Sequence, residues 1–163
     1  WQVSGPHEGC EVKDVTTIPD VLSADLQWHA PFSSNLSLVM PRNVAGVRDQ
    51  DVKAGMFYLR ICLAASEAID VVLSLGSDSS YRIWLNGCEI ACDPTVPCPC
   101  DPDEYQHPIG LRGGRNEIVI AYDGRNSMGI VAWGLCARII CPQNEDQLLL
   151  DTLRVVAADD MQP

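Results

Sequence analysis

The chain has 163 residues, the length of one domain, and its 47% apolar residues are typical of a globular protein rather than a disordered acidic tail. Its 22 acidic residues against 11 Lys and Arg give a formal charge of −11, which argues against binding to nucleic acid or to an anionic membrane surface. No apolar run approaches the ~20 residues of a membrane helix. Because the chain begins at Trp1 rather than Met, we expect a processed product or an excised piece of a longer protein.

Short β-rich runs between turn signals predict an all-β fold as far as residue 140 or so. The expected strands are, in chain order, residues 12–16 and 36–39 (both weak), 57–63, 69–75, 81–85, 117–122 and 129–140. Residues 1–142 are expected to form one β-sandwich domain. Residues 143–163 then form a C-terminal extension or linker, whose apolar spacing suits an edge strand and a short helix equally.

The run at 81–85 carries the clearest pattern. Trp84 and Arg82 fall on the face opposite Ile83 and Leu85, because side chains alternate along a strand. Asn86-Gly87 follows at once and predicts a two-residue hairpin, since both central residues of a type I′ turn need a positive φ.

Three motifs carry a resemblance to a known family: Gly76-Ser77-Asp78, then Ile83-Trp84-Leu85-Asn86-Gly87, then Leu111-x-x-Gly114-x-Asn116. Their order resembles the galactose-binding-like jelly-roll domains attached to secreted bacterial polysaccharide-degrading enzymes. The resemblance covers roughly residues 1–140. It implies a jelly-roll sandwich of two antiparallel sheets with about eight or nine strands. It also implies that a ligand is held by loops at one end or on an exposed sheet face.

The resemblance further implies a non-catalytic accessory module of a secreted or cell-surface protein that binds a polysaccharide or glycan. Such a module would stack a sugar on an aromatic ring and bond its hydroxyls from polar groups nearby. The candidate residues are Trp84, Arg82, Tyr81, Asp78 and Tyr105. Trp84 suits equally well a place beneath the cysteine-rich loop, and alternation places Trp133 in the core.

Catalysis is not expected, because no H-E-x-x-H, G-x-S-x-G, phosphate-loop or dinucleotide motif is present in the sequence. Two other functions stay open. One is a structural β-sandwich that packs against a neighbouring domain or subunit and binds no sugar. The other is a metal-binding module on the Cys- and Asp-rich loop of residues 88–107.

Eight cysteines predict disulfides and an oxidising compartment. Within the resembling fold, the strands that carry Cys62 and Cys136 lie near one another, which implies a Cys62–Cys136 pair. The chain ends meet in that fold, which implies a second pair between Cys10 and Cys141. The remaining four cysteines are expected to pair locally. Cys98-Pro99-Cys100 is too tight to close easily on itself, which favours Cys88 and Cys92 as the partners of Cys98 and Cys100.

The same four cysteines could instead bind zinc, although their spacing is irregular for a structural site. The acidic residues Asp101, Asp103 and Glu104 suit a solvated loop or a hard-cation site. Members of the family often hold a structural Ca²⁺, but in other loops, so no calcium ligand is assigned here and no other cofactor is expected.

Overall fold

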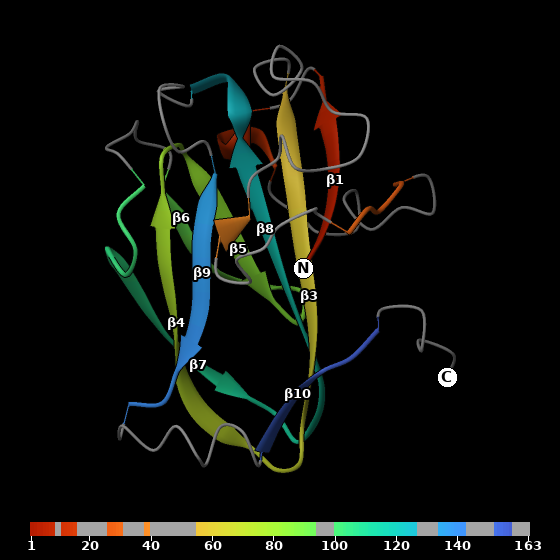
Figure 1. Ribbon diagram of the computed structural model, residues 1–163, viewed down its shortest axis with the longest axis vertical. Coiled ribbons are helices and arrows are strands. Elements are labelled where there is room, and N and C mark those ends of the chain that lie inside the picture. The colour runs from red at the N-terminus through yellow and green to blue at the C-terminus, as the bar shows by residue number, and fades with distance from the viewer. Residues whose placement is uncertain are drawn as a thin grey trace.

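The computed structural model describes residues 1–8, 11–15, 26–30, 38–39, 55–93, 100–126, 134–142 and 152–157. Within these residues the protein is a sandwich of two antiparallel β-sheets, with short 3₁₀ turns at Val12–Asp14 (η1) and Gly124–Asn126 (η3) (Figure 1). The predicted all-β, two-sheet fold is confirmed. No helix in the described part of the chain has the length and hydropathy of a membrane span.

Two sheets make up the described part of the sandwich. Sheet A has the spatial order β1 (Gln2–His7), β3 (Met56–Ala65), β8 (Gly114–Asp123), β5 (Tyr81–Leu85) and β6 (Cys88–Asp93), and β10 (Leu153–Val155) also pairs with β3. Sheet B has the order β2 (Leu38–Val39), β9 (Leu135–Ile140), β4 (Ile69–Ser77) and β7 (Tyr105–Leu111). Among the described strands, each strand is followed in the chain by one of the other sheet, except in the β5–β6 hairpin, so the chain links the two layers repeatedly.

The expected strands at 57–63, 69–75, 81–85 and 117–122 correspond to β3, β4, β5 and β8, and the described part of the run at 129–140 is β9. The strand expected at 12–16 was wrong, because Val12–Asp14 is a 3₁₀ turn. Strand β7 was missed because Pro108 and Gly110 interrupt its sequence. Its place at the edge of sheet B tolerates a proline there.

Asn86 and Gly87 form the hairpin turn that the sequence predicted. Their φ angles are 50° and 86°, and Leu85 pairs with Cys88 across the turn. Both positive values suit a type I′ turn, whose twist matches that of the flanking strands. In the tail, Leu153–Val155 pairs antiparallel with the end of β3, so this part of the extension is an edge strand.

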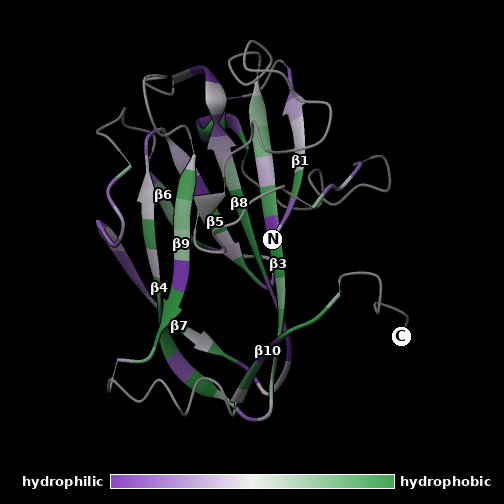
Figure 2. Ribbon diagram, viewed as in Figure 1, coloured by the Kyte–Doolittle hydropathy of each residue, from purple (hydrophilic) through white to green (hydrophobic). Residues whose placement is uncertain are grey.

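The main core lies between the sheets and consists of side chains that alternate along the strands. Figure 2 marks the hydropathy of each residue along these strands. Its largest fully buried members include Phe57, Leu59, Leu73, Leu75, Ile83, Ile118, Ile120, Tyr122 and Leu135. Because neighbouring residues point the other way, each strand of sheet A also offers a set of side chains to its outer face.

That outer face of sheet A holds a second core. Met56, Tyr58, Trp84, Val119 and Ala121 pack there as cross-strand neighbours on β3, β5 and β8. The N-terminal segment covers them, through Val12 and Val15 around η1 and through Leu26 and Trp28. Both faces of sheet A are therefore buried in this region, which decides the position of several predicted site residues.

Candidate functional site

Trp84, the foremost candidate for sugar stacking, is buried in the second core with only 1% of its surface exposed. Trp84 points away from Ile83 and Leu85, as strand alternation predicts. The face of sheet A to which it points is covered by the N-terminal segment. Trp84 therefore offers no ring face to a ligand. Trp133 lies outside the described residues.

Arg82 lies on the same covered face and bonds to the segment above it. Its guanidinium donates to the carbonyl oxygens of Val15 (2.7 Å) and Lys13 (3.4 Å), and it is 3.3 Å from a carboxylate oxygen of Glu89. Only 9% of the residue is exposed. These contacts fasten the N-terminal cover to sheet A, so Arg82 is a structural residue rather than a ligand-binding one.

Asp78 is also internal. It accepts hydrogen bonds from the Tyr122 hydroxyl (2.5 Å) and from the Gly134 backbone N–H (3.2 Å). These bonds join the end of β4 to β8 and to the residue that precedes β9. The Gly-Ser-Asp motif is thus explained by folding, as a tie between the two sheets.

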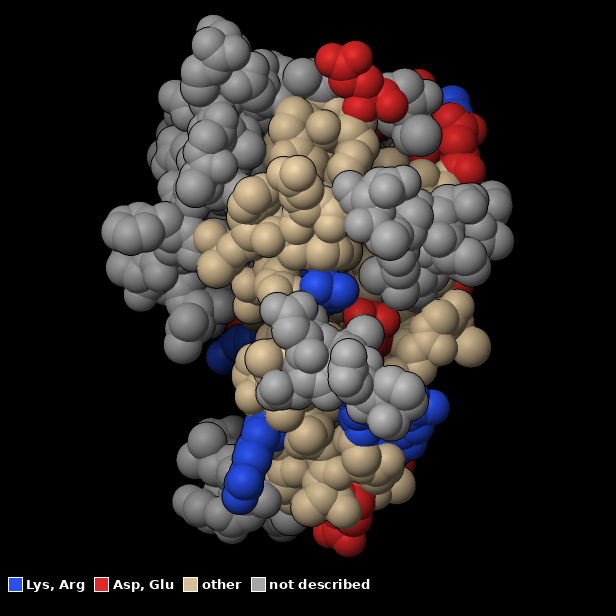
Figure 3. Space-filling model, turned by 90° about the vertical axis from the view of Figure 1, so that its right-hand side faces the viewer, with Lys and Arg blue, Asp and Glu red and all other residues tan. Residues whose placement is uncertain are grey.

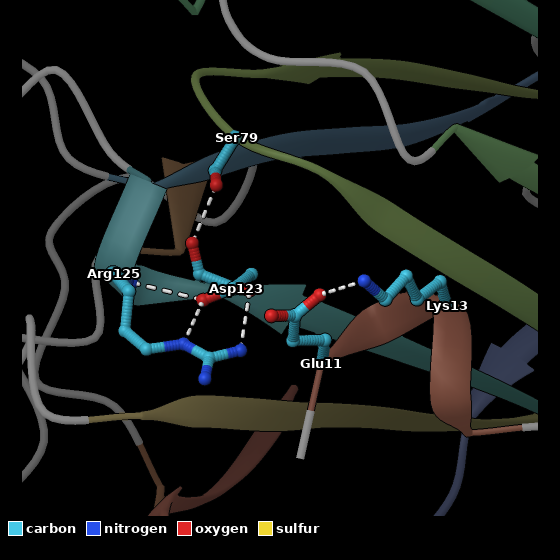
Figure 4. A network of polar contacts seen from close by, with 5 residues as sticks. All are labelled: Glu11, Lys13, Ser79, Asp123 and Arg125. Atoms are coloured by element: carbon cyan, nitrogen blue, oxygen red, sulfur yellow. Dashed lines mark hydrogen bonds and ion pairs between the residues drawn. The ribbon is translucent and has the colours of Figure 1, made fainter. Parts of the chain in front are cut away.

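A neighbouring polar network closes the same end of the sandwich (Figure 4). The Ser79 hydroxyl donates to the Asp123 carbonyl oxygen, and the Asp123 carboxylate accepts from Arg125 Nε (2.9 Å) and Nη2 (2.7 Å). Asp123 is almost fully buried, and its charge is compensated by this paired geometry. Lys13 and Glu11 form a separate, exposed ion pair nearby. The network is structural.

The other two candidates, Tyr81 and Tyr105, meet at the open side of the sandwich between the edge strands β6 and β7. Their ring centroids are 5.5 Å apart at 60°, and the ring of His107 is 6.1 Å from that of Tyr81. The Tyr81 hydroxyl lies 3.3 Å from His107 Nε2. Tyr81 is buried, whereas Tyr105 and His107 are half-buried and reach solvent. We call these three residues the aromatic cluster.

Burial sets the ionisation of the aromatic cluster. Burial raises the pKa of Tyr81, and the negative charges of Asp93 and Glu104 raise it further. Burial lowers the pKa of His107. Both groups are therefore neutral at neutral pH, and the phenol and imidazole form an uncharged hydrogen-bonding pair. The carboxylates of Asp93 and Glu104 bring negative charge close to this pair. The cluster thus combines accessible rings with uncharged and anionic polar groups.

His107 was not among the predicted binding residues. The signal that could have placed it is the alternation of Tyr105, His107, Ile109 and Leu111, which sends all four toward the interior of the sandwich. The sequence did not predict this strand, because a proline at position 108 is more typical of a loop.

The opposite side of the sandwich contains an apolar pocket of about 470 Å³. Its lining residues are Trp1, Ile61, Leu73, Ile118, Ala137, Arg138, Ile139 and Val155. Val155 is 70% exposed beside it. Figure 3 looks onto the side that carries β1, β3 and β10. Its described surface is uncharged in the upper middle, with Lys and Arg side chains in the middle and lower parts and Asp and Glu side chains at the top, near the middle and at the bottom. This lining suits hydrocarbon better than a sugar, which needs polar partners.

The acidic loop is tied to sheet B rather than assembled as a cation site. Asp103 accepts from Arg138 Nε (2.8 Å) and from the Ser74 hydroxyl (2.6 Å). Among the described residues, no three His, Cys, Asp or Glu side chains gather in a way that could hold a metal ion. Cys98, which the proposed zinc set requires, lies outside the described residues.

The Asp103 contacts predict a pH dependence of stability. The hydrogen bonds from Arg138 and Ser74 lower the pKa of Asp103. Its contribution is therefore complete above the unfolded value of about 3.9 and is lost as the pH falls through the folded value. Because one third of the Asp103 side chain and more than half of the Arg138 side chain are exposed, we expect this contribution to stay below about 1 kcal/mol. Urea unfolding of the wild type and Asp103→Asn between pH 6 and 2.5 should show their difference shrinking below pH 4; a constant difference would contradict the assignment.

The six described cysteines carry free thiols in this structure. The expected Cys62–Cys136 pair is not made: β3 and β9 belong to different sheets, and the Cys62 sulfur instead accepts from Arg115 Nη2 (3.3 Å). Cys136 faces Cys100 across 3.5 Å. Cys88 and Cys92, the expected partners of Cys98 and Cys100, both lie on β6; Cys98 lies outside the described residues, so its pairing stays a prediction. Cys10 lies outside the described residues, so the Cys10–Cys141 pair stays a prediction.

Comparisons with known proteins find similarity to solved structures. No model of a known protein family matches the chain, and no curated protein matches it in sequence. Two crystal structures of a β-glucosidase from Kluyveromyces marxianus, one labelled with selenomethionine and one in complex with glucose, share 18% identity with it at a TM-score of 0.45. Each comparison covers 71% of this chain and 14% of the β-glucosidase chain, so this protein corresponds to a small part of that enzyme's length.

Proposed function

We propose that this domain is a non-catalytic module of a secreted or cell-surface protein, and that it binds carbohydrate at the aromatic cluster of Tyr81, Tyr105 and His107. The observation that carries the proposal is the position of these rings at the open side between β6 and β7, with the carboxylates of Asp93 and Glu104 close by. A neighbouring domain of a longer parent chain would supply any catalysis.

The chemistry of the cluster suits a sugar. The C–H face of a pyranose packs on an aromatic ring, and its hydroxyls need acceptors and donors around that ring. Tyr105 offers a half-buried ring that meets Tyr81 edge to face. His107 is half-buried and neutral, so it can donate or accept a hydrogen bond, while carboxylates accept from hydroxyls.

The proposal keeps two of the five predicted residues and replaces the others for a physical reason. Trp84, Arg82 and Asp78 are already saturated by internal packing and hydrogen bonds. Tyr81 and Tyr105 lie together at an edge where the sandwich is open. The resemblance to galactose-binding-like domains supports a binding role through the type of fold rather than through the motif residues, which serve folding, and the number of cysteines supports secretion.

Tyr105→Ala is expected to weaken glycan binding by about tenfold or more, because a lost ring contact costs roughly 1.5 kcal/mol. Tyr105→Phe keeps the ring and should retain most of the affinity. A glycan array identifies the ligand for the wild type, and titration calorimetry then compares the variants. Val155→Ser, on the opposite side, is the control for a surface change, and circular dichroism checks that each variant is folded.

A wild type that binds no glycan on the array would overturn the carbohydrate proposal. The alternative is then a packing module whose apolar pocket beside Val155 receives side chains of a neighbouring domain. A wild type that binds, with Tyr105→Ala unchanged in affinity, would move the binding site away from the aromatic cluster.

A further inference from the structure

Residues 100–103, which we call the clasp, lie across the outer face of sheet B just before β7. Two cross-strand pairs of β4 and β9 lie beneath them: Gly76 opposite Cys136, and Ser74 opposite Arg138. These pairs are two residues apart along each strand, so their side chains share one face of the sheet. The clasp therefore meets four sheet positions that are adjacent to one another.

Three residues of the clasp, Cys100, Asp101 and Asp103, contact this face. At one end the Cys100 thiol donates to the Cys136 sulfur, with 3.5 Å between the two sulfur atoms. At the other end Asp103 accepts from Arg138 and Ser74. Between them the Asp101 carbonyl packs onto Gly76 so closely that a Cβ there would lie 2.1 Å from the carbonyl oxygen. Only a glycine allows this approach.

The close approach at Gly76 bears directly on the cysteines. Asp101 is the next residue after Cys100, and Gly76 is the cross-strand partner of Cys136. The backbone that follows Cys100 is therefore held against β4 at the position that pairs with Cys136. Both side chains are half-buried, so they are accessible to a small reagent, whereas Cys62 and Cys141 are buried.

We propose that Cys100 and Cys136 form a reversible disulfide under oxidising conditions, and that this bond locks the clasp onto sheet B. A disulfide bond is about 2.05 Å long, so the two sulfur atoms must approach by roughly 1.5 Å. Rotation of the two side chains can supply most of such a shift. The pairing is independent of the carbohydrate proposal, because it rests on the clasp alone.

A low-molecular-weight disulfide such as oxidised glutathione is the oxidant. The Cys136 thiolate attacks one sulfur of that disulfide, forms a mixed disulfide and releases one glutathione thiolate. The Cys100 thiolate then attacks the Cys136 sulfur, closes the protein disulfide and releases the second glutathione thiolate. Two protein thiols are oxidised, one glutathione disulfide is reduced to two thiols, and the two protons pass to the released thiolates.

The hydrogen bond between the thiols favours this order. The bond from Cys100 lowers the pKa of Cys136 and raises that of Cys100 itself, because it stabilises the Cys136 thiolate and engages the Cys100 proton. The carboxylates of Asp78 and Asp103 oppose ionisation, but the hydrogen bond is the larger effect at Cys136. Cys136 is therefore the attacking thiol, and Cys100 resolves the mixed disulfide.

The test uses the full chain, equilibrated in glutathione buffers from fully reduced to fully oxidised and alkylated to trap free thiols. Trypsin cleaves after Arg125 and Arg138, which leaves Cys136 as the single cysteine of its peptide. Cleavage after Arg82 and Arg112 places Cys88, Cys92, Cys98 and Cys100 in one other peptide. Tandem mass spectrometry of the joined peptides then identifies which of these four is bonded.

We expect the two peptides to be joined through Cys100 at the oxidised end, with the loss of two hydrogens. The melting temperature should rise by about 5–10 °C on oxidation, as the loop between the cysteines is closed. Cys100→Ser and Cys136→Ser should each abolish both effects, while the control Cys88→Ser retains them. Alkylation of both thiols at the oxidised end, or a bond from Cys136 to Cys62, Cys88, Cys92 or Cys98, would overturn the proposal.

Discussion

Trp84→Ala is expected to lower the free energy of unfolding by about 3–5 kcal/mol, because it removes a large side chain that is fully buried. The loss is large since Val119 and Ala121 on one side, and Val12 and Val15 on the other, cannot all close the cavity. Urea denaturation at pH 7 measures the change directly. If instead Trp84 were an exposed stacking platform, its removal would leave stability nearly unchanged.

Two variants sharpen this experiment. Trp84→Phe fills most of the space and should cost clearly less than Trp84→Ala. Val155→Ala changes a side chain that is 70% exposed and should stay within about 0.5 kcal/mol of the wild type. A Trp84→Ala protein as stable as the Val155→Ala control would show that the outer face of sheet A is not a packed core.

Asn116→Ala is expected to cost about 2–4 kcal/mol, because the Asn116 side chain is fully buried and joins two turns. Its Oδ1 accepts from the Arg112 N–H (3.0 Å) and from Asn86 Nδ2 (2.9 Å), and its Nδ2 donates to the Arg112 carbonyl (2.8 Å). Asn86 in turn accepts from the Glu117 N–H (2.9 Å). Removal of Asn116 breaks these bonds and leaves the half-buried Asn86 amide without its partner on β8, while the exposed Arg112 backbone can turn to water.

A double-mutant cycle separates this network from simple loss of volume. Asn86→Ala and Asn116→Ala share one hydrogen bond, so their effects on the free energy of unfolding should be non-additive by about 1 kcal/mol. Asn116→Asp keeps the shape but replaces the donor with a second acceptor that faces the Arg112 carbonyl oxygen, so it should also lower the free energy of unfolding. Strictly additive effects would show that the two turns are stabilised separately.

Asn86 and Asn116 show which part of the motifs can be predicted from sequence. The Asn-Gly turn after Leu85 was predicted from local chemistry, because a type I′ turn depends on its own two residues. The link from Asn86 to Asn116 could not be predicted, since the residues are thirty positions apart and meet only when β5 and β8 pair. The motifs that carry the family resemblance are thus used for folding in this structure.

For the predicted binding residues too, the sequence indicated the strand face but not whether that face is buried. Alternation correctly placed Trp84 and Arg82 on the face opposite Ile83, but it cannot tell whether that face meets solvent or another segment. In the structure the irregular N-terminal segment covers that face: Arg82 binds its backbone carbonyls, and its apolar side chains pack on Trp84. Tyr81 and Tyr105 became neighbours because β5 and β7 lie in opposite sheets that meet at an open side.

The acidic, cysteine-rich and apolar composition by itself determined a globular domain, and the period-two runs determined an all-β sandwich and most of its central strands. Local chemistry also determined the Asn86-Gly87 turn. Only the tertiary structure decided which faces are covered and which thiols meet: Cys136 lies beside Cys100 rather than Cys62 because the clasp crosses β4 at Gly76. The physical reason is that strand alternation depends on neighbouring residues, whereas burial and pairing depend on segments that are distant in sequence.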